Sequence, residues 1–270
     1  MVDAVASILD MGEIHTERAE RWDWLRLQFG KANAVGPTLL NRLESEIEKM
    51  NVIVGDGPAR PLLITGEGAA FSAGLDLPTL LAFDRGQMVA FLRHFHSVFL
   101  RLACLQRPTI AAVNGHAVAG GAVLALACDY RIGVRTIAGS NKVPVLGVNE
   151  VVIGLPFPRS AAAIVEHGLG GPARAGELML TGELFGPDDA VRHGLLHTVV
   201  EPGDLQRAAE QHAARFAAAG GSAVAAVKAD LCRSLAVLAA EDADDAAFVD
   251  AWFSFDTQRR LLAAVSKLKS

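Results

Sequence analysis

Residues 109–134 read TIAAVNGHAVAGGAVLALACDYRIGV, and this stretch carries two short apolar runs on either side of a longer one. Thr109–Val113 and Tyr130–Val134 are typical of strands that are covered on both faces. The apolar run Ala117–Cys128 has 12 residues, well short of the ~20 that cross a bilayer, so we expect a buried helix there. Strand, helix and strand in this order predict a parallel sheet.

The same alternation extends toward the N-terminus. Trp24–Phe29 alternates apolar and polar residues as a strand does, and a helical apolar pattern follows from about residue 37 to residue 50. A second such pair is expected at residues 61–65 and 86–105. After residue 159 we expect helices with one short strand at 196–200; the helices are predicted at 159–168, 172–180, 187–193, 203–219, 221–238 and 243–268.

Composition limits the classes of function. The chain has 270 residues, 51% of them hydrophobic, and a net charge of -5, which gives no electrostatic footprint for nucleic acid. Its three cysteines are widely spaced, without any CxxC, so neither a disulfide framework nor a zinc site is expected. Asp3 stands where a signal peptide carries positive charge. We therefore expect a cytoplasmic protein with reduced thiols and no membrane partner.

Two glycine-containing segments are candidates for an anion-binding site. Phe71–Leu77 reads FSAGLDL after a predicted strand, and such a turn can direct backbone N–H groups at an anionic oxygen. A glycine turn capped by Asp76 explains the same residues equally well. Gly120 is expected near the start of the central helix, where free N–H groups favour negative charge. Close helix packing is the alternative there.

Together the two segments resemble the crotonase (enoyl-CoA hydratase/isomerase) superfamily, in which an F-x-A-G-x-D turn and an A-V-N-G-x-A-x-G-G helix start occur about 45 residues apart. Lys31-Ala32-Asn33-Ala34 is similar to the family's adenine-contacting K-x-N-A. The resemblance covers roughly residues 20–265. It implies the ClpP/crotonase fold, an α/β spiral of ββα units. It also implies a core domain over 1–200, a helical oligomerisation region over 201–270, and a homotrimer or dimer of trimers.

The resemblance further implies a site for an acyl-CoA thioester. The backbone N–H groups of Leu75 and Gly120 are expected to bind the thioester oxygen as an oxyanion hole, and Glu150 is the expected catalytic acid-base. No cofactor is implied, because coenzyme A is part of the substrate. The expected substrate-binding residues surround these three: Lys31, Ala32, Ala73, Asp76, Leu77 and Val123.

The number of carboxylates in the expected site indicates which reaction it catalyses. The family's hydratases have two glutamates, one of them three residues after the oxyanion glycine, where this chain has Val123. Hydration is served by two carboxylates, whereas moving a double bond from the 3,4 to the 2,3 position needs one base. Asn149-Glu150-Val151 also resembles the isomerase branch. We expect a Δ3,Δ2-enoyl-CoA isomerase; the alternatives are a hydratase, another CoA-thioester reaction and a non-catalytic acyl-CoA binder.

Other candidate groups give weaker signals. His94 and His96 are two residues apart, so on a helix they point in different directions, and no metal site is expected. His116 is more typical of a packed or hydrogen-bonded histidine than of a catalytic one. Lys267 either contacts the CoA nucleotide, as the resemblance suggests, or is solvated. No G-x-S-x-G elbow and no G-K-[ST] phosphate loop occurs in the sequence.

Overall fold

The computed structural model describes residues 12–50, 57–242 and 245–268. A six-stranded sheet has the order β1-β2-β3-β5-β7-β9. A three-stranded sheet has the order β4-β6-β8. The strands are β1 (Glu13–Arg18), β2 (Asp23–Gln28), β3 (Leu62–Gly66), β4 (Ala70–Ser72), β5 (Thr109–Val113), β6 (His116–Val118), β7 (Tyr130–Val134), β8 (Leu146–Gly147) and β9 (Thr198–Val200).

Pairing within the larger sheet is parallel from β2 to β9, and β1 joins the edge as the antiparallel partner of β2. The predicted parallel α/β sheet is therefore confirmed. Every residue of β3 and β5 is buried, which is why these strands appear in the sequence as continuous apolar runs. The predicted strands at 109–113 and 130–134 have the predicted bounds.

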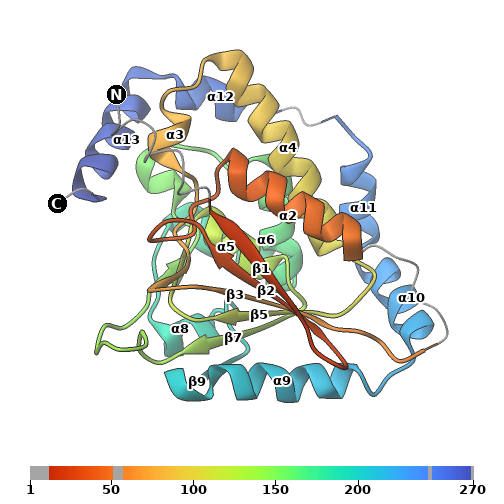
Figure 1. Cartoon of the computed structure of the whole chain (residues 1–270). Coiled ribbons are helices and arrows are strands. Elements are labelled where there is room, and N and C mark those ends of the chain that lie inside the picture. The colour runs from red at the N-terminus through yellow and green to blue at the C-terminus, as the bar shows by residue number, and fades with distance from the viewer. Residues whose placement is uncertain (1–11, 51–56, 243–244, 269–270) are drawn as a thin grey trace, which may run out of the picture.

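Helices enclose the sheets on both sides (Figure 1). The long ones before residue 200 are α2 (Pro37–Met50), α4 (Arg85–Ala103), α6 (Arg159–Leu169) and α7 (Pro172–Thr181). Shorter ones are α3 (Leu77–Leu80), α5 (Gly120–Leu126), α8 (Pro187–Arg192) and the 3-10 helices η1 (Glu150–Ile153) and η2 (Pro202–Asp204). The C-terminal helices are α9 (Leu205–Phe216), α10 (Gly221–Leu231), α11 (Arg233–Ala239), α12 (Ala246–Trp252) and α13 (Phe255–Leu268).

Side-chain alternation along the central strands makes two cores. On β3, Ile64 packs toward the larger core with α2 and α4, whereas Leu63 packs on the opposite face. That opposite face is covered by α9 through its buried Ala209 and Ala213 (Figure 1). Successive strand residues point to opposite faces of the sheet, so a strand with a hydrophobic core on each face has apolar side chains on both faces.

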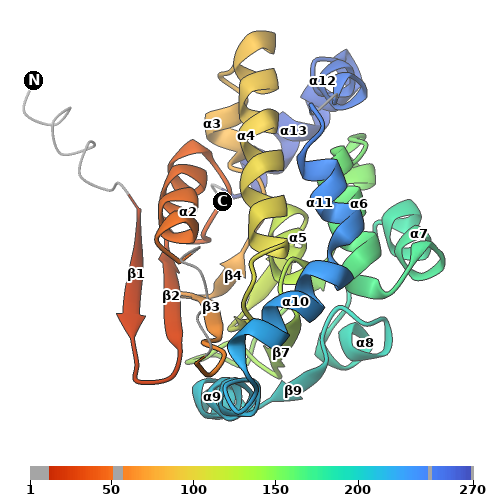
Figure 2. The same cartoon turned by 90° about the vertical axis from the view of Figure 1, so that its right-hand side faces the viewer.

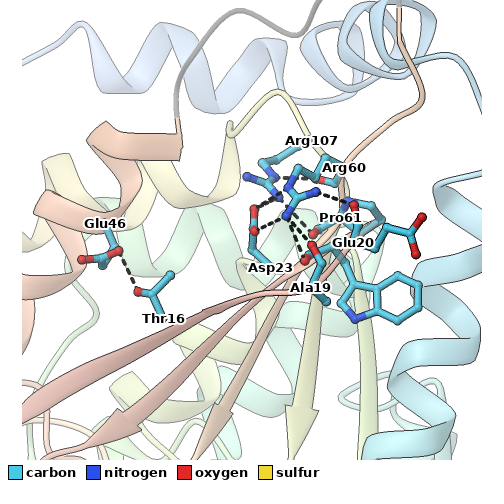
Figure 3. Close-up of polar contacts among 9 residues, drawn as sticks. Thr16, Ala19, Glu20, Asp23, Glu46, Arg60, Pro61 and Arg107 are labelled. Atoms are coloured by element: carbon cyan, nitrogen blue, oxygen red, sulfur yellow. Dashed lines mark hydrogen bonds and ion pairs between the residues drawn. The ribbon is translucent and has the colours of Figure 1, made fainter.

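A buried ionic cluster fixes the start of the strands (Figure 3). The Asp23 carboxylate accepts from Arg60 Nη2 at 2.7 Å and from Arg107 Nη2 at 2.7 Å. Arg60 also donates to the Ala19 and Glu20 carbonyls, which ties the β1–β2 turn to β3. Burial alone raises the pKa of Asp23, but hydrogen bonds and charge from the two arginines lower it below the usual value.

The predicted helix 117–128 is wrong at its start, because residues 116–118 form β6 and the helix begins at Gly120. β6 lies between β4 and β8, and this tertiary pairing overrides the apolar helical pattern. The predicted helix 221–238 is two helices that meet at Cys232, and the region 243–268 contains α12 and α13. The first residues of that region lie partly outside the described residues.

Candidate active site

The small sheet brings together segments that are distant in sequence. Leu75, Gly120 and Glu150 each lie two or three residues beyond the end of β4, β6 and β8, respectively. These strands are parallel neighbours, so the segments that follow them emerge at one edge of the sheet. Such an edge is where ligands bind in parallel α/β sheets.

A narrow cavity of about 10 Å³, roughly the space that one water molecule occupies, lies at this edge. Four residues singled out from the sequence line it, namely Leu75, Gly120, Val123 and Glu150. The rest of the lining is apolar and comes from α4, the start of α6, and α12: Leu92, Phe95, Pro158, Ala161 and Phe248. Among the described residues, Glu150 is thus the one titratable side chain in a cavity otherwise lined by apolar groups and glycine backbone.

The backbone amides of Leu75 and Gly120 are close neighbours. A Cβ atom added to Gly120 would lie 3.7 Å from the Leu75 nitrogen, and one added to Gly74 would lie 3.2 Å from the Gly120 nitrogen. Within the part of the chain that the structure describes, neither N–H group donates to a protein acceptor, although Asp76 N donates to the Val35 carbonyl. Two unpaired donors beside one cavity can bind an oxygen that carries negative charge.

The backbone before Gly120 adopts an uncommon conformation. Ala119 has φ 50° and ψ -127°, a region that residues with a side chain seldom occupy. Its N–H donates to the Gly147 carbonyl at 2.8 Å, which holds the turn against β8. At Gly121, an added Cβ would lie 2.0 Å from the Ser72 carbonyl oxygen, so only glycine permits this approach to β4. The contacts therefore fix the direction of the Gly120 amide.

Glu150 opens η1 and is 6% exposed. Its Oε2 atom is buried without a hydrogen-bond partner among the described residues. Burial disfavours the charged form and raises the pKa of this carboxyl to about 7, against a smaller opposite effect of a backbone hydrogen bond. A carboxyl with this pKa can accept and return protons near neutral pH.

The last helix holds η1 in place. Thr257 Oγ1 donates to the Gly154 carbonyl at 3.3 Å, and Arg260 Nη1 donates to the Val152 carbonyl at 3.2 Å. Both donors belong to α13, so a C-terminal element positions the segment that carries Glu150. Sequence reasoning missed these two residues, because nothing in a helical pattern indicates which distant carbonyl its polar face will meet.

Val123 lies on α5 one turn beyond Gly120 and is fully buried. Its side chain lines the same cavity as Glu150. The cavity thus contains an apolar group at the position where the two-glutamate arrangement expected for hydratases requires a carboxylate.

The loop 31–35 braces the Leu75 turn. Asn33, which sequence reasoning did not select as a site residue, is fully buried with φ 50°, and its Nδ2 donates to the Ala70 carbonyl at 2.9 Å. Val35 N donates to the Gly74 carbonyl at 2.7 Å, and Ala73 N donates to the Ala32 carbonyl at 2.9 Å. The K-x-N-A segment therefore holds the candidate oxyanion turn in place.

The remaining expected binding residues lie outside the cavity lining. Lys31 and Ala73 are exposed and Ala32 is half-buried, all on the outer side of this loop pair. Leu77 begins α3, and Asp76 is its N-cap, with the carboxylate accepting from Thr79 N at 3.3 Å. The capping interpretation of Asp76 is confirmed.

The histidines show ordinary structural contacts. His116 Nδ1 accepts from Val145 N at 3.1 Å, and burial, with the charge of Lys142, lowers its pKa. His94 pairs with Glu44, and His96 contacts the Leu238 carbonyl. Over the described ranges no group of three or more potential ligands gathers for a metal ion, and no helix is long and apolar enough to span a membrane. Lys267 lies exposed in the last turn of α13.

The remaining apolar part of the cavity lining was not predicted as part of the site. Leu92, Phe95 and Phe248 were visible in the sequence only as apolar positions of helices, and Pro158 and Ala161 only as part of a helix start. Their place in the cavity depends on how α4, α6 and α12 meet, which a local pattern does not specify.

The chain is similar in sequence to a known protein family and to proteins of named activity. Residues 27–259 match the sequence profile of the family described as enoyl-CoA hydratase/isomerase. A crotonyl-CoA hydratase of Syntrophomonas wolfei is 34% identical over 199 residues, which are 72% of this chain and 74% of that protein. A 4-chlorobenzoyl coenzyme A dehalogenase of Arthrobacter sp. is 31% identical over 194 residues, 70% of this chain and 66% of that protein.

Similarity also extends to solved structures. The crystal structure of human mitochondrial delta3-delta2-enoyl-CoA isomerase superposes with a TM-score of 0.83 at 25% identity, covering 95% of this chain and 98% of that one. The ClpP/crotonase fold expected from the sequence is thereby confirmed. The relatives named here carry three different reaction names, so similarity alone does not select one reaction.

Proposed function

The chain belongs to the enoyl-CoA hydratase/isomerase family, and from this premise we propose that it is a Δ3,Δ2-enoyl-CoA isomerase that uses one glutamate. The observation that carries the proposal is the cavity lining, in which Glu150 is the one titratable side chain and Val123 is apolar. One base suffices to move a double bond, whereas hydration is served by two carboxylates.

In the proposed reaction, the thioester oxygen accepts hydrogen bonds from the N–H groups of Leu75 and Gly120. Removal of a proton from C2 concentrates negative charge on that oxygen, so both donors bind the dienolate more strongly than the substrate. Loss of one such donor costs ~3 to 4 kcal/mol of transition-state stabilisation in known oxyanion holes. The unpaired state of both amides supports this role.

Glu150 is the proposed proton shuttle. Its carboxylate takes the C2 proton of a 3-enoyl thioester and returns it to C4, which leaves the double bond between C2 and C3. A pKa of about 7 balances the two half-reactions, because the same group must act first as base and then as acid. Val123 leaves no second carboxylate in the lining to activate water.

Hydration is the second candidate, favoured by the 34% identity to a protein named crotonyl-CoA hydratase. A hydratase built on this site would rely on Glu150 alone. Another CoA-thioester reaction and a non-catalytic acyl-CoA binder complete the alternatives. The binder is disfavoured by the burial of an unpaired carboxyl, which costs stability and gains nothing unless the group reacts.

The proposal also includes the cofactor requirement, the contacts with CoA, the location and the assembly of the protein. We expect no cofactor and no metal, since coenzyme A arrives with the substrate and amides bind the developing charge. Lys31, Ala32, Ala73, Asp76 and Leu77 lie near the loop pair that supports the Leu75 turn and are proposed to contact the CoA moiety. A cytoplasmic homotrimer or dimer of trimers, associated through residues 201–270, is the proposed assembly.

The test is a panel of 2-enoyl, 3-enoyl and 3-hydroxyacyl-CoA thioesters, assayed with the wild type and with Glu150→Gln. We expect conversion of the 3-enoyl substrate as the fastest reaction and a ~10² to 10⁴-fold lower turnover in the variant, with acyl-CoA binding retained. Glu177→Gln, at an exposed position on α7, is the matched control. Faster hydration of crotonyl-CoA than isomerisation, or near wild-type turnover in Glu150→Gln, contradicts the proposal.

A further inference from the structure

Two cysteines meet where α4 ends against the junction of α10 and α11. Cys104 is the C-cap of α4, and Cys232 is the single residue between α10 and α11. Cys232 Sγ lies 3.3 Å from the Ala103 carbonyl oxygen, and Cys104 Sγ lies 4.0 Å from the Cys232 carbonyl oxygen. Each sulfur therefore faces the backbone at the other cysteine, and the two thiols shift each other's pKa. Neither residue lines the cavity that holds Glu150.

Basic groups surround the thiol of Cys232. His167 on α6 and Lys228 on α10 both lower the pKa of this thiol. Lys228 is held by Asp129 Oδ2 at 2.7 Å and by the Arg107 carbonyl at 2.9 Å, so its ammonium group cannot swing away. The exposed residues on either side, Asp230 and Arg233, pair with each other at 2.6 Å.

These contacts make one proton of the pair easy to remove. The hydrogen bond from Cys104 is the largest cause that lowers the pKa of Cys232, to about 5; burial opposes it, and His167 and Lys228 add to the lowering. The same contact raises the pKa of Cys104, and the Cys232 thiol raises the pKa of His167. These shifts favour a thiolate on Cys232 over one on Cys104.

Accessibility differs between the two sulfurs. Cys104 is partly exposed, whereas Cys232 is 2% exposed. Figure 2 shows α11 beside α4 and α6. A surface pocket is lined by residues of α6 and of the α10–α11 region. His167 lines that pocket together with Ala163, Glu166, Leu231, Ser234 and Leu235. Cys104 is thus the more accessible of the two cysteines to a small reagent, and Cys232 is the more protected one.

We propose that Cys104 and Cys232 form a redox-active dithiol site that reacts with small disulfides. Cys104 gives its proton to the Cys232 thiolate and attacks one sulfur of the reagent RSSR, forming a mixed disulfide and releasing RS⁻. Cys232 then passes its proton to His167, and its thiolate attacks the Cys104 sulfur and releases a second RS⁻. Starting from one thiol and one thiolate, the pair gives two electrons and one proton to the reagent, and a second proton from the solvent lets the reagent leave as two RSH. The product is a Cys104–Cys232 disulfide.

The third cysteine provides an internal control. Cys128 is buried just after the C-terminus of α5, with its Sγ 3.8 Å from the Leu124 carbonyl oxygen. Burial, followed by the charge of Asp129, raises its pKa to about 12, and the smaller opposite effects of Lys228, Arg131 and Thr109 do not offset this. A protonated, buried thiol is inert toward exchange. Replacement of Cys128 should leave the reaction of the other pair unchanged.

The experiment treats the folded, full-length chain with oxidised glutathione at pH 7.5 and follows intact mass and non-reduced peptide maps. We expect the wild type and Cys128→Ser to lose two hydrogens, to show a peptide link between residues 104 and 232, and to revert with dithiothreitol. Cys232→Ser should stop at one glutathione adduct on Cys104. Cys104→Ser should form neither product at a comparable rate.

A pH profile separates this chemistry from a packing role of the same residues. The rate of wild-type oxidation should have its midpoint below pH 7, and His167→Gln should move that midpoint upward and slow the reaction at least several-fold at pH 7. Circular dichroism identifies variants that fail to fold, and the wild-type profile alone then decides. A folded wild type that keeps all its thiols reduced, or one that forms only glutathione adducts without the 104–232 link, overturns the proposal.

Discussion

Glu150 should impose a pH-dependent cost on the stability of the folded chain. The carboxyl is buried with Oε2 unpaired, and its pKa is raised from 4.5 to about 7. Glutamine has nearly the same shape and no charge to desolvate. Glu150→Gln should therefore lower activity and, above neutral pH, increase stability, as expected where a catalytic group is held in an unfavourable environment.

The size and the sign of this change in the free energy of unfolding follow from proton linkage. Between pH 4.5 and about 7, the carboxyl ionises in the unfolded chain but stays protonated in the folded one. The unfolded chain then binds fewer protons, so the free energy of unfolding falls as pH rises through this window. Each pKa unit is worth about 1.4 kcal/mol, so the wild type loses about 3 kcal/mol by pH 8 that Glu150→Gln does not lose.

Urea unfolding, followed by circular dichroism at fixed protein concentration from pH 4.5 to 8.5, measures the effect. The amide introduced by Glu150→Gln makes its own local contacts, and these add a pH-independent constant to the difference in free energy of unfolding between the two proteins. The quantity to compare is therefore the change of that difference with pH. Glu177→Gln should show no comparable change, because Glu177 is exposed on α7. If the difference in free energy of unfolding between the wild type and Glu150→Gln stays constant across pH, the reasoning is refuted. The proposed mechanism then loses its premise that burial raises the pKa of Glu150.

Three further changes test other parts of the molecule. Val123→Glu restores a second carboxylate in the cavity and should raise the ratio of hydration to isomerisation, measured on 2-enoyl and 3-enoyl thioesters, even at a stability cost of several kcal/mol. Phe248→Ala enlarges the apolar end of the cavity and should raise kcat/KM for an eight-carbon relative to a four-carbon thioester by roughly tenfold; no shift would exclude this wall as the limit. Asp23→Asn leaves buried Arg107 without its charge partner and should lower the free energy of unfolding by ~3 to 5 kcal/mol at pH 7, with a loss below 1 kcal/mol counting against the cluster.

The sequence allowed the buried strands and the long helices to be predicted, because their patterns are local. Thr109–Val113 and Tyr130–Val134 are apolar throughout and need no partner to be recognised as strands. The candidate site residues Leu75, Gly120 and Glu150 were found through glycine turns and an acidic residue in motifs that resemble those of a family. The structure brings these three residues to one cavity.

The features that were missed depend on tertiary contacts. β4, β6 and β8 have two or three residues each, too few to show a period, and they exist because they pair with one another. For the same reason, the helix that was predicted to begin at Ala117 begins at Gly120, after the residues that pair in β6. Likewise, the conformation of Ala119 is fixed by its bond to the Gly147 carbonyl, which no residue type at position 119 would reveal.

The C-terminal region contributes to the candidate site as well as to the fold. Thr257 and Arg260 of α13 hold the carbonyls of η1, the helix that begins with Glu150, and Phe248 of α12 closes the cavity. Meanwhile Phe255 and Leu262 on α13 are 83% and 59% exposed, an apolar surface suited to contact with another subunit. A contact that orders α13 therefore acts on the segment that carries Glu150 through these two hydrogen bonds. If residues 201–270 mediate assembly, as the family resemblance implies, subunit association and the geometry of the proposed base are physically linked.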